Sequence, residues 1–140
     1  MICVAIHAAG LTVILRRLGS VVLPRDPGFL AGTWFLVRVA WGLIFIHLAQ
    51  IAVWAMFYYF VRCLPDVETA FYFSIVSYTT VGYGDVVLDK EWRVLAGVEA
   101  LTGILMCGLS TGFFFAVVTK LRNMLQSAKD ADEPSHPENF

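Results

Sequence analysis

The stretch that decides the fold reads Thr79-Thr80-Val81-Gly82-Tyr83-Gly84-Asp85, and we call it the glycine loop (residues 79–85). Glycine adopts a positive φ at little cost, so Gly82 and Gly84 allow left- and right-handed residues to alternate along the loop. Such alternation turns successive carbonyl groups toward one side. Carbonyl oxygens in a row, with the Thr80 hydroxyl below them, can replace the water shell of an alkali cation. An ordinary glycine-rich turn between two helices is the alternative interpretation, since Gly-x-Gly alone is a weak motif.

Composition indicates an integral membrane protein with a single domain. The chain has 140 residues, of which 59% are hydrophobic and only 15% are charged, and this balance is unusual for a soluble domain. The formal net charge of -1 suggests no nucleic-acid partner. The three cysteines have neither paired spacing nor nearby histidines in a pattern that would suggest a metal site, so we expect them to pack as apolar side chains. Cross-linking of subunits through Cys63, near the predicted outer mouth, is the alternative.

Two long apolar segments flank a short one, and the glycine loop follows the short one. Residues 39–61 carry no formal charge and are long enough to span a bilayer, and residues 92–121 form a second predicted span. Residues 68–79, capped by Asp66, predict a helix of about 18 Å, which is too short to span. Such a helix must turn back, and the glycine loop is the turn. Because one chain supplies one wall of a pore, closure requires several copies around an axis.

The apolar N-terminus, residues 1–15, ends in Arg16 and Arg17. Fifteen helical residues reach about 22 Å, short of a hydrocarbon core of roughly 30 Å. The segment lacks the polar face of a surface-lying helix, and a secretory signal would carry its basic residues first. We therefore expect a short extra membrane helix, and whether it spans the membrane or is truncated stays open. The basic linker that follows predicts a cytoplasmic location for it and for the C-terminus.

Polar side chains inside the predicted helices need partners. His47 and Gln50 fall within residues 39–61, where polar groups usually form hydrogen bonds to other helices. A proton-sensing role for His47 is the alternative interpretation. We expect His7, in the N-terminal segment, to be a helix-packing residue.

Residues 34–121 resemble the pore module of potassium channels, which consists of an outer helix, a re-entrant pore helix, a selectivity filter and an inner helix. The glycine loop matches the signature of that family without a substitution. The resemblance implies a homotetramer, or a pseudo-tetramer, in which K+ is the permeant ion and no cofactor is needed. It assigns the ion sites to the loop backbone and to the Thr80 hydroxyl, with filter residues Thr80, Val81, Gly82, Tyr83 and Gly84.

Four residues are predicted to support the filter. Asp85 looks like the acid that the family places behind the outer mouth, and Tyr72 stands where the family usually has a tryptophan that bonds to this acid. A carboxylate within a span is a candidate functional group, and this applies to Glu99. From its depth we expect Glu99 near the base of the pore helix, protonated and bonded to Thr79 or to a neighbouring hydroxyl.

The inner helix supplies the predicted cavity. Helical spacing places Ile104, Cys107 or its neighbour Gly108, Thr111 and Phe115 on one stripe. Residues 113–115, all phenylalanine, are candidates for a hydrophobic constriction near the inner mouth, and for at least two of them a lipid-facing position is the alternative. Gly103 is a gating hinge or, equally, a packing position. The run from Glu99 through Phe115 resembles the inner helix of prokaryotic inward rectifiers, which have two transmembrane helices.

These observations predict an all-α membrane protein in three parts. Residues 1–30 form the N-terminal helix and cytoplasmic linker, residues 31–122 the potassium-channel pore domain, and residues 123–140 a disordered cytoplasmic tail. The predicted function is passive conduction of K+ across a lipid bilayer, with a bacterial inner membrane as the predicted location. The alternative is a non-conducting or partner-dependent subunit with a channel-like fold, and an unidentified regulatory subunit is left open. An enzyme has least support, because no Ser/His/Asp set, metal-ligand cluster or phosphate loop occurs.

Overall fold

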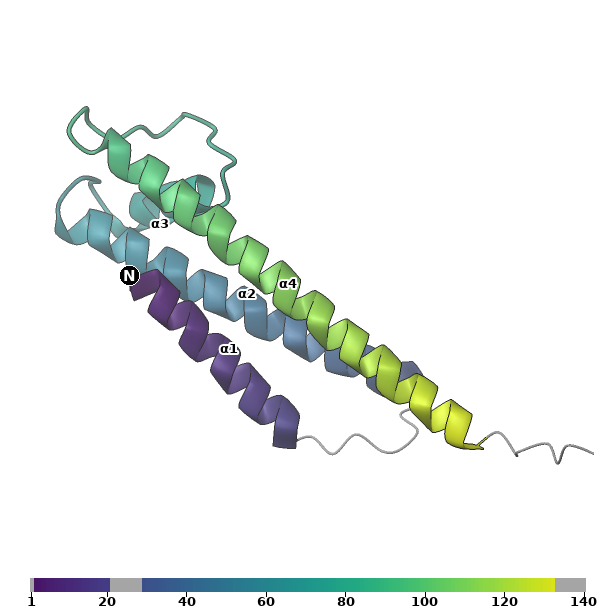
Figure 1. Ribbon diagram of the computed structural model, residues 1–140. Helices are drawn as coiled ribbons and strands as arrows, with labels where there is room; N and C mark the ends of the chain where they lie inside the picture. The colour runs from purple at the N-terminus through teal and green to yellow at the C-terminus, as the bar shows by residue number, and fades with distance from the viewer. Residues whose placement is uncertain (1, 21–28, 133–140) are drawn as a thin grey trace, which may run out of the picture.

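The structure is a computed structural model that describes residues 2–20 and 29–132, and these form four helices without a strand (Figure 1). Residues 21–28, which include the predicted linker from Pro24 to Gly28, and residues 133–140, the end of the predicted tail, lie outside the described residues. In chain order the helices are α1 (Ile2–Ser20), α2 (Phe29–Phe60), α3 (Val67–Tyr78) and α4 (Arg93–Asp132).

Two of these helices are long and apolar enough to cross a membrane, by length and composition. They are the segments Leu30–Phe60 in α2 and Arg93–Ser127 in α4, as the sequence predicted. Each helix is longer than the corresponding predicted span. The predicted spans were bounded by charged residues, and a charged residue interrupts an apolar run without ending a helix. The structure differs from the predicted tail over residues 123–132, which continue α4. Residues 113–132 contain neither glycine nor proline, so nothing local breaks the helix there.

The chain reverses sharply between α2 and α3. Arg62 has φ 59, and the amide groups of Arg62 and Cys63 bond to the carbonyls of Tyr59 (3.1 Å) and Tyr58 (3.0 Å). This is the Schellman arrangement that ends a helix and satisfies its last carbonyls, here with arginine at the left-handed position. Four residues later, Asp66 caps α3 by accepting a 2.8 Å hydrogen bond from the Thr69 amide.

The helix α1 lies alongside α2 and also contacts α4 (Figure 1). Two close approaches set its position: a Cβ added at Gly10 would lie 2.5 Å from Ile46 Cγ1, and one at Gly42 would lie 3.0 Å from Ile14 Cδ1. At each glycine, an isoleucine side chain of the other helix thus packs against the backbone. Glycines that admit a large side chain from a neighbour allow membrane helices to pack closely.

Apolar side chains fill the space between the helices in three clusters along the bundle. One, around Tyr58 and Phe73, joins α2 to α3 and to the segment before α4. A second, around Leu43, packs α2 against α1 and α4. The third lies between them and consists of Ile51, Tyr78 and Met106, which come from α2, α3 and α4. The last residue of α3 is therefore held at the meeting point of the two long helices.

Candidate functional site

The glycine loop has the alternating backbone that its glycines predicted. Gly82 has φ 56 and Gly84 has φ 78, with residues of ordinary φ between them. Thr80 has φ 62 and extends the alternation by one residue. A β-branched residue rarely adopts this conformation, at a cost of about 1–3 kcal/mol, so the sequence carried no signal for it.

Hydrogen bonds to the last turns of α3 hold the start of the loop. The Thr80 amide bonds to the Ser77 carbonyl at 3.0 Å, and the Gly82 amide bonds to the Val76 carbonyl at 3.2 Å. These bonds direct two loop amides back toward α3. The predicted ion ligands are loop carbonyl groups that make no bond to the protein. Thr80 and Gly82 take part in these two hydrogen bonds through their amides and not through their carbonyl groups.

One face of the loop is open in the single chain. Val81 is 52% exposed and Tyr83 is 73% exposed, and all the other residues of the loop are exposed as well. Burial of a tyrosine and a valine beside a glycine-rich backbone would require further protein at this face. The exposed face of the loop in one chain is thus free to meet another protein surface, and its predicted role as one wall of a pore stays a prediction.

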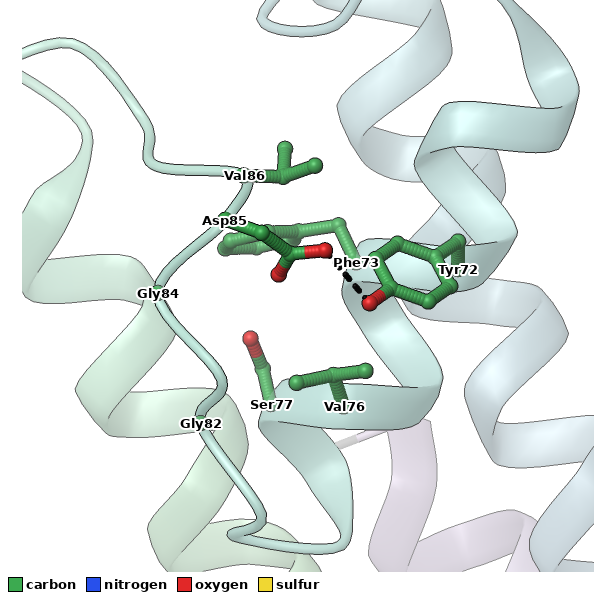
Figure 2. Close-up of a pocket in the computed structure, with 8 residues that line it drawn as sticks. All are labelled: Tyr72, Phe73, Val76, Ser77, Gly82, Gly84, Asp85 and Val86. Carbon is green, nitrogen blue, oxygen red and sulfur yellow. Dashed lines mark hydrogen bonds between the residues drawn. The ribbon is translucent and has the colours of Figure 1, made fainter.

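The outer end of the loop is tied to α3 by Tyr72 and Asp85. The Tyr72 hydroxyl donates a 2.6 Å hydrogen bond to Asp85 Oδ2, and Figure 2 shows the carboxylate turned from the loop toward this ring. This hydrogen bond holds the pKa of the Asp85 carboxyl below its usual value and raises the pKa of the Tyr72 hydroxyl. The predicted bond between the two residues is therefore present.

A small cavity of about 130 Å³ separates the loop from α3. Figure 2 shows its lining: Tyr72, Phe73, Val76, Ser77, Gly82, Gly84, Asp85 and Val86. Of these residues, Phe73 is buried and packs edge to face against Tyr58, with ring centroids 5.2 Å apart. The core of the molecule thus extends to the back of the glycine loop.

Glu99 of α4 is fully buried, and its carboxyl group faces α2 and α3. Its Oε2 accepts a 2.9 Å hydrogen bond from the Tyr58 hydroxyl, and its Oε1 lies within hydrogen-bonding distance of Ser74 Oγ. The Thr79 hydroxyl instead donates to the Ile75 carbonyl within α3, at 2.7 Å. Of the two partners expected for Glu99, Thr79 and a neighbouring hydroxyl, the structure therefore shows the neighbouring hydroxyl and not Thr79.

The buried and exposed faces of α4 have different neighbours. Gly103, Met106 and Ser110 continue the buried face from Glu99, and a Cβ added at Gly103 would lie 1.9 Å from the Tyr78 carbonyl oxygen. Gly103 is therefore a position of close helix packing, and α4 continues through it. The four predicted cavity residues are all exposed and lie on the other face: Ile104, Cys107, Thr111 and Phe115.

Metal chemistry through side chains has little basis in the part of the chain that the structure describes. No group of three or more histidine, cysteine, aspartate or glutamate side chains within residues 2–20 and 29–132 could hold a metal ion. Cys3, Cys63 and Cys107 are all free.

Comparison with known proteins identifies one family. The model of a family described as ion channel matches residues 33–120, which cover most of α2, all of α3 and the glycine loop, and most of α4. The match leaves out α1. The search of curated proteins and the search of solved structures each returned no match.

Proposed function

Because the chain belongs to the ion channel family, we propose that it is a potassium-selective channel subunit that conducts K+ passively down its electrochemical gradient. The single observation that carries this proposal is the positive φ at Thr80, Gly82 and Gly84, spaced two residues apart. Alternating backbone of this kind brings successive carbonyls into one row, which substitutes for the hydration shell of the ion. In this proposal the glycine loop is the selectivity filter and α3 is the pore helix.

The proposed active form is a homotetramer in a lipid bilayer. Four loops around an axis would surround the ion with carbonyls and cover the exposed Val81 and Tyr83. The exposed stripe of α4 would then line the cavity below the filter, with Phe115 nearest the inner end. The C-terminal end of α3 would direct its partial negative charge toward this cavity, which favours a cation there. We place the protein in a bacterial inner membrane, with the C-terminus in the cytoplasm.

The left-handed conformation of Gly82 provides the test of this assignment. Alanine at φ 56 is strained by roughly 1–2 kcal/mol, so Gly82→Ala should distort the loop and abolish K+ uptake into proteoliposomes. Gly97→Ala is the matched control, because Gly97 lies in α4 and its added Cβ would meet nothing within 4 Å. It should conduct like the unmodified protein. Robust K+ uptake by Gly82→Ala would contradict the filter assignment.

A further inference from the structure

Five polar side chains form a closed ring in the middle of the bundle, at the end of α3. They are His7 from α1, His47 and Gln50 from α2, Tyr78 from α3 and Ser110 from α4. His7, Gln50 and Tyr78 are at most 2% exposed, and Ser110 is 7% exposed. The interhelical hydrogen bonds predicted for His47 and Gln50 are confirmed. The packing role expected for His7 was too narrow, because its ring joins α1 to the polar groups of two other helices.

Each neighbour in this hydrogen-bond ring lies within bonding distance of the next. His7 Nδ1 is 3.1 Å from Gln50 Nε2, and His7 Nε2 is 3.5 Å from Ser110 Oγ. Ser110 Oγ is 2.9 Å from His47 Nε2, and His47 Nδ1 is 3.0 Å from the Tyr78 hydroxyl. The Tyr78 hydroxyl donates to Gln50 Oε1, and this contact closes the ring.

The hydrogens of the ring can be assigned by counting donors and acceptors. The Tyr78 hydroxyl has one hydrogen, which Gln50 Oε1 accepts, so His47 Nδ1 must donate to Tyr78. A neutral His47 then accepts from Ser110, and Ser110 in turn accepts from His7 Nε2. His7 Nδ1 is left to accept from the Gln50 amide. Every member donates once and accepts once, and both imidazoles are neutral.

The position of Tyr78 connects this ring to the glycine loop. Tyr78 is the last residue of α3, and the loop begins at the next residue. Its side chain is held by the ring, and its carbonyl group lies against the backbone of α4 at Gly103. The end of α3 therefore cannot shift without breaking bonds in the ring. A buried donor or acceptor that loses its partner costs more than an ordinary hydrogen bond contributes.

Helix α1 lies outside the segment that matches the ion channel family, yet it supplies one member of the ring. The approach of Gly10 to Ile46 and of Ile14 to Gly42 sets the register of α1 on α2. Gly10 is one helical turn from His7, so the same register aims the imidazole at Gln50 and Ser110. Without α1, the Gln50 amide and the Ser110 hydroxyl would each lose a partner inside the bundle.

We propose that α1 is a positioning element for the glycine loop, and that His7 is its positioning residue, acting through Gln50 and Ser110 on Tyr78. This inference rests on the proposed potassium-channel function. The ring fixes the end of α3, which fixes where the loop backbone begins and so the spacing of its carbonyl groups. Removing His7, or displacing α1, lets the loop relax, and discrimination between K+ and Na+ falls.

The test compares variants of the full chain in proteoliposomes by the ratio of Rb+ to Na+ uptake. His7→Leu removes both bonds of the imidazole and should lower the ratio by about tenfold, which is about 1.4 kcal/mol of discrimination between the two ions. His7→Gln keeps a donor and an acceptor, and its ratio should lie closer to that of the unmodified protein. Size-exclusion chromatography before reconstitution ensures that equal amounts of assembled protein are compared.

A second variant displaces α1 without touching the ring. Gly10→Val places a branched side chain against Ile46 and should lower the ratio as His7→Leu does. Cys3 is 8% exposed, so its thiol should label with a maleimide only when α1 leaves α2, and peptide mapping separates it from the other cysteines. Ala9→Val changes an exposed neighbour of Gly10 and should leave both the ratio and the labelling unchanged.

The outcomes separate this inference from the function on which it rests. If the unmodified protein shows no uptake that prefers Rb+ over Na+, the proposed function and the inference both fail. If it shows that preference and His7→Leu shows the same ratio, the inference alone is overturned. A lower yield of assembled His7→Leu protein with an unchanged ratio also overturns it, because the imidazole would then serve stability alone.

Discussion

At the scale of the residue, the contacts of Ser74 bear on the charge of Glu99. Ser74 Oγ lies 3.0 Å from the Ile51 carbonyl oxygen and also within bonding distance of Glu99 Oε1. A carbonyl can only accept, and a hydroxyl has one hydrogen, so Ser74 either shares its hydrogen between the two oxygens or donates to Ile51 and accepts from a protonated Glu99. We expect the second arrangement, because it gives each contact its own hydrogen. Tyr58 donates to the other carboxyl oxygen. A neutral acid also avoids the large cost of burying an unpaired charge.

Substitutions at Glu99 test this assignment. Glutamine reproduces the protonated acid, since its amide donates to Ser74 and its carbonyl accepts from Tyr58, so Glu99→Gln should change the free energy of unfolding by less than about 1 kcal/mol. Glu99→Ala leaves both hydroxyl groups without this partner and should destabilise the protein by about 1–3 kcal/mol. Denaturant unfolding followed by tryptophan fluorescence measures both. Equal destabilisation by the two variants would show that the carboxylate is charged.

The Tyr72–Asp85 bond predicts a pH dependence at the outer end of the loop. The hydrogen bond from Tyr72 lowers the pKa of Asp85 in the folded protein. A lowered pKa stabilises the fold fully above the ordinary carboxyl value of about 3.9, and this contribution disappears as the pH falls through the lowered pKa. Tyr72→Phe removes the donor, so the pKa of Asp85 should rise toward the ordinary value.

Carbon-13 NMR of the labelled Asp85 carboxyl group, titrated in acid, gives this pKa directly. The midpoint should move to higher pH in Tyr72→Phe, and the resonances of Asp66 provide an internal control. Asp66 has its own lowered pKa because it accepts a hydrogen bond from the Thr69 amide, which the substitution does not touch. An unchanged Asp85 midpoint would mean that Tyr72 does not lower this pKa.

Residue types predicted some of these details and missed others. Glycine at positions 82 and 84 signals positive φ by itself, and aspartate before a helix signals a cap, so both features followed from local chemistry. Thr80 also adopts the left-handed conformation, which its residue type does not signal. The partners of Glu99 come from two other helices, and sequence spacing within one helix carries no information about them.

At the scale of the element, Gly103 determines how closely α3 approaches α4. Its added Cβ would lie 1.9 Å from the Tyr78 carbonyl oxygen, and a backbone atom cannot rotate away. Gly103→Ala should therefore separate the two helices and destabilise the protein by about 1–3 kcal/mol, despite the better helix propensity of alanine. Gly97→Ala meets no neighbour within 4 Å and should stabilise α4 by up to about 1 kcal/mol.

Thermal unfolding in detergent compares the two alanine variants. The account expects melting temperatures that move in opposite directions. A melting temperature for Gly103→Ala equal to that of the unmodified protein would mean that the close approach is not needed for stability. The comparison measures packing alone, and a hinge at Gly103 stays a separate prediction about gating.

The existence and order of the helices could be predicted because each is a long apolar run or a short capped one. The ends of the helices could be predicted less well from the sequence. The helix α2 begins before its first long uncharged run, and α4 extends through polar residues of high helix propensity. The attachment of α1 could not be predicted from periodicity. It depends on matching glycines and isoleucines on two helices, and only their register brings these residues together.

At the scale of the whole molecule, the exposed surfaces of the single chain are distributed as a tetramer would require. The glycine loop and the stripe of α4 that contains Ile104 and Phe115 are exposed, whereas the opposite face of α4 packs against α2 and α3. Apolar surface on a membrane protein faces lipid or another subunit. The proposed four-fold arrangement assigns the loop face to the pore axis and leaves α1 beside α2.

The measurement that tests this account most directly is ion uptake into liposomes that contain the purified protein, with Rb+ and K+ compared against Na+. The account predicts uptake of Rb+ and K+, little uptake of Na+, and block by Ba2+, which matches K+ in size and carries twice its charge. Equal uptake of K+ and Na+, or no uptake at any pH by protein that is assembled as a tetramer, would contradict it.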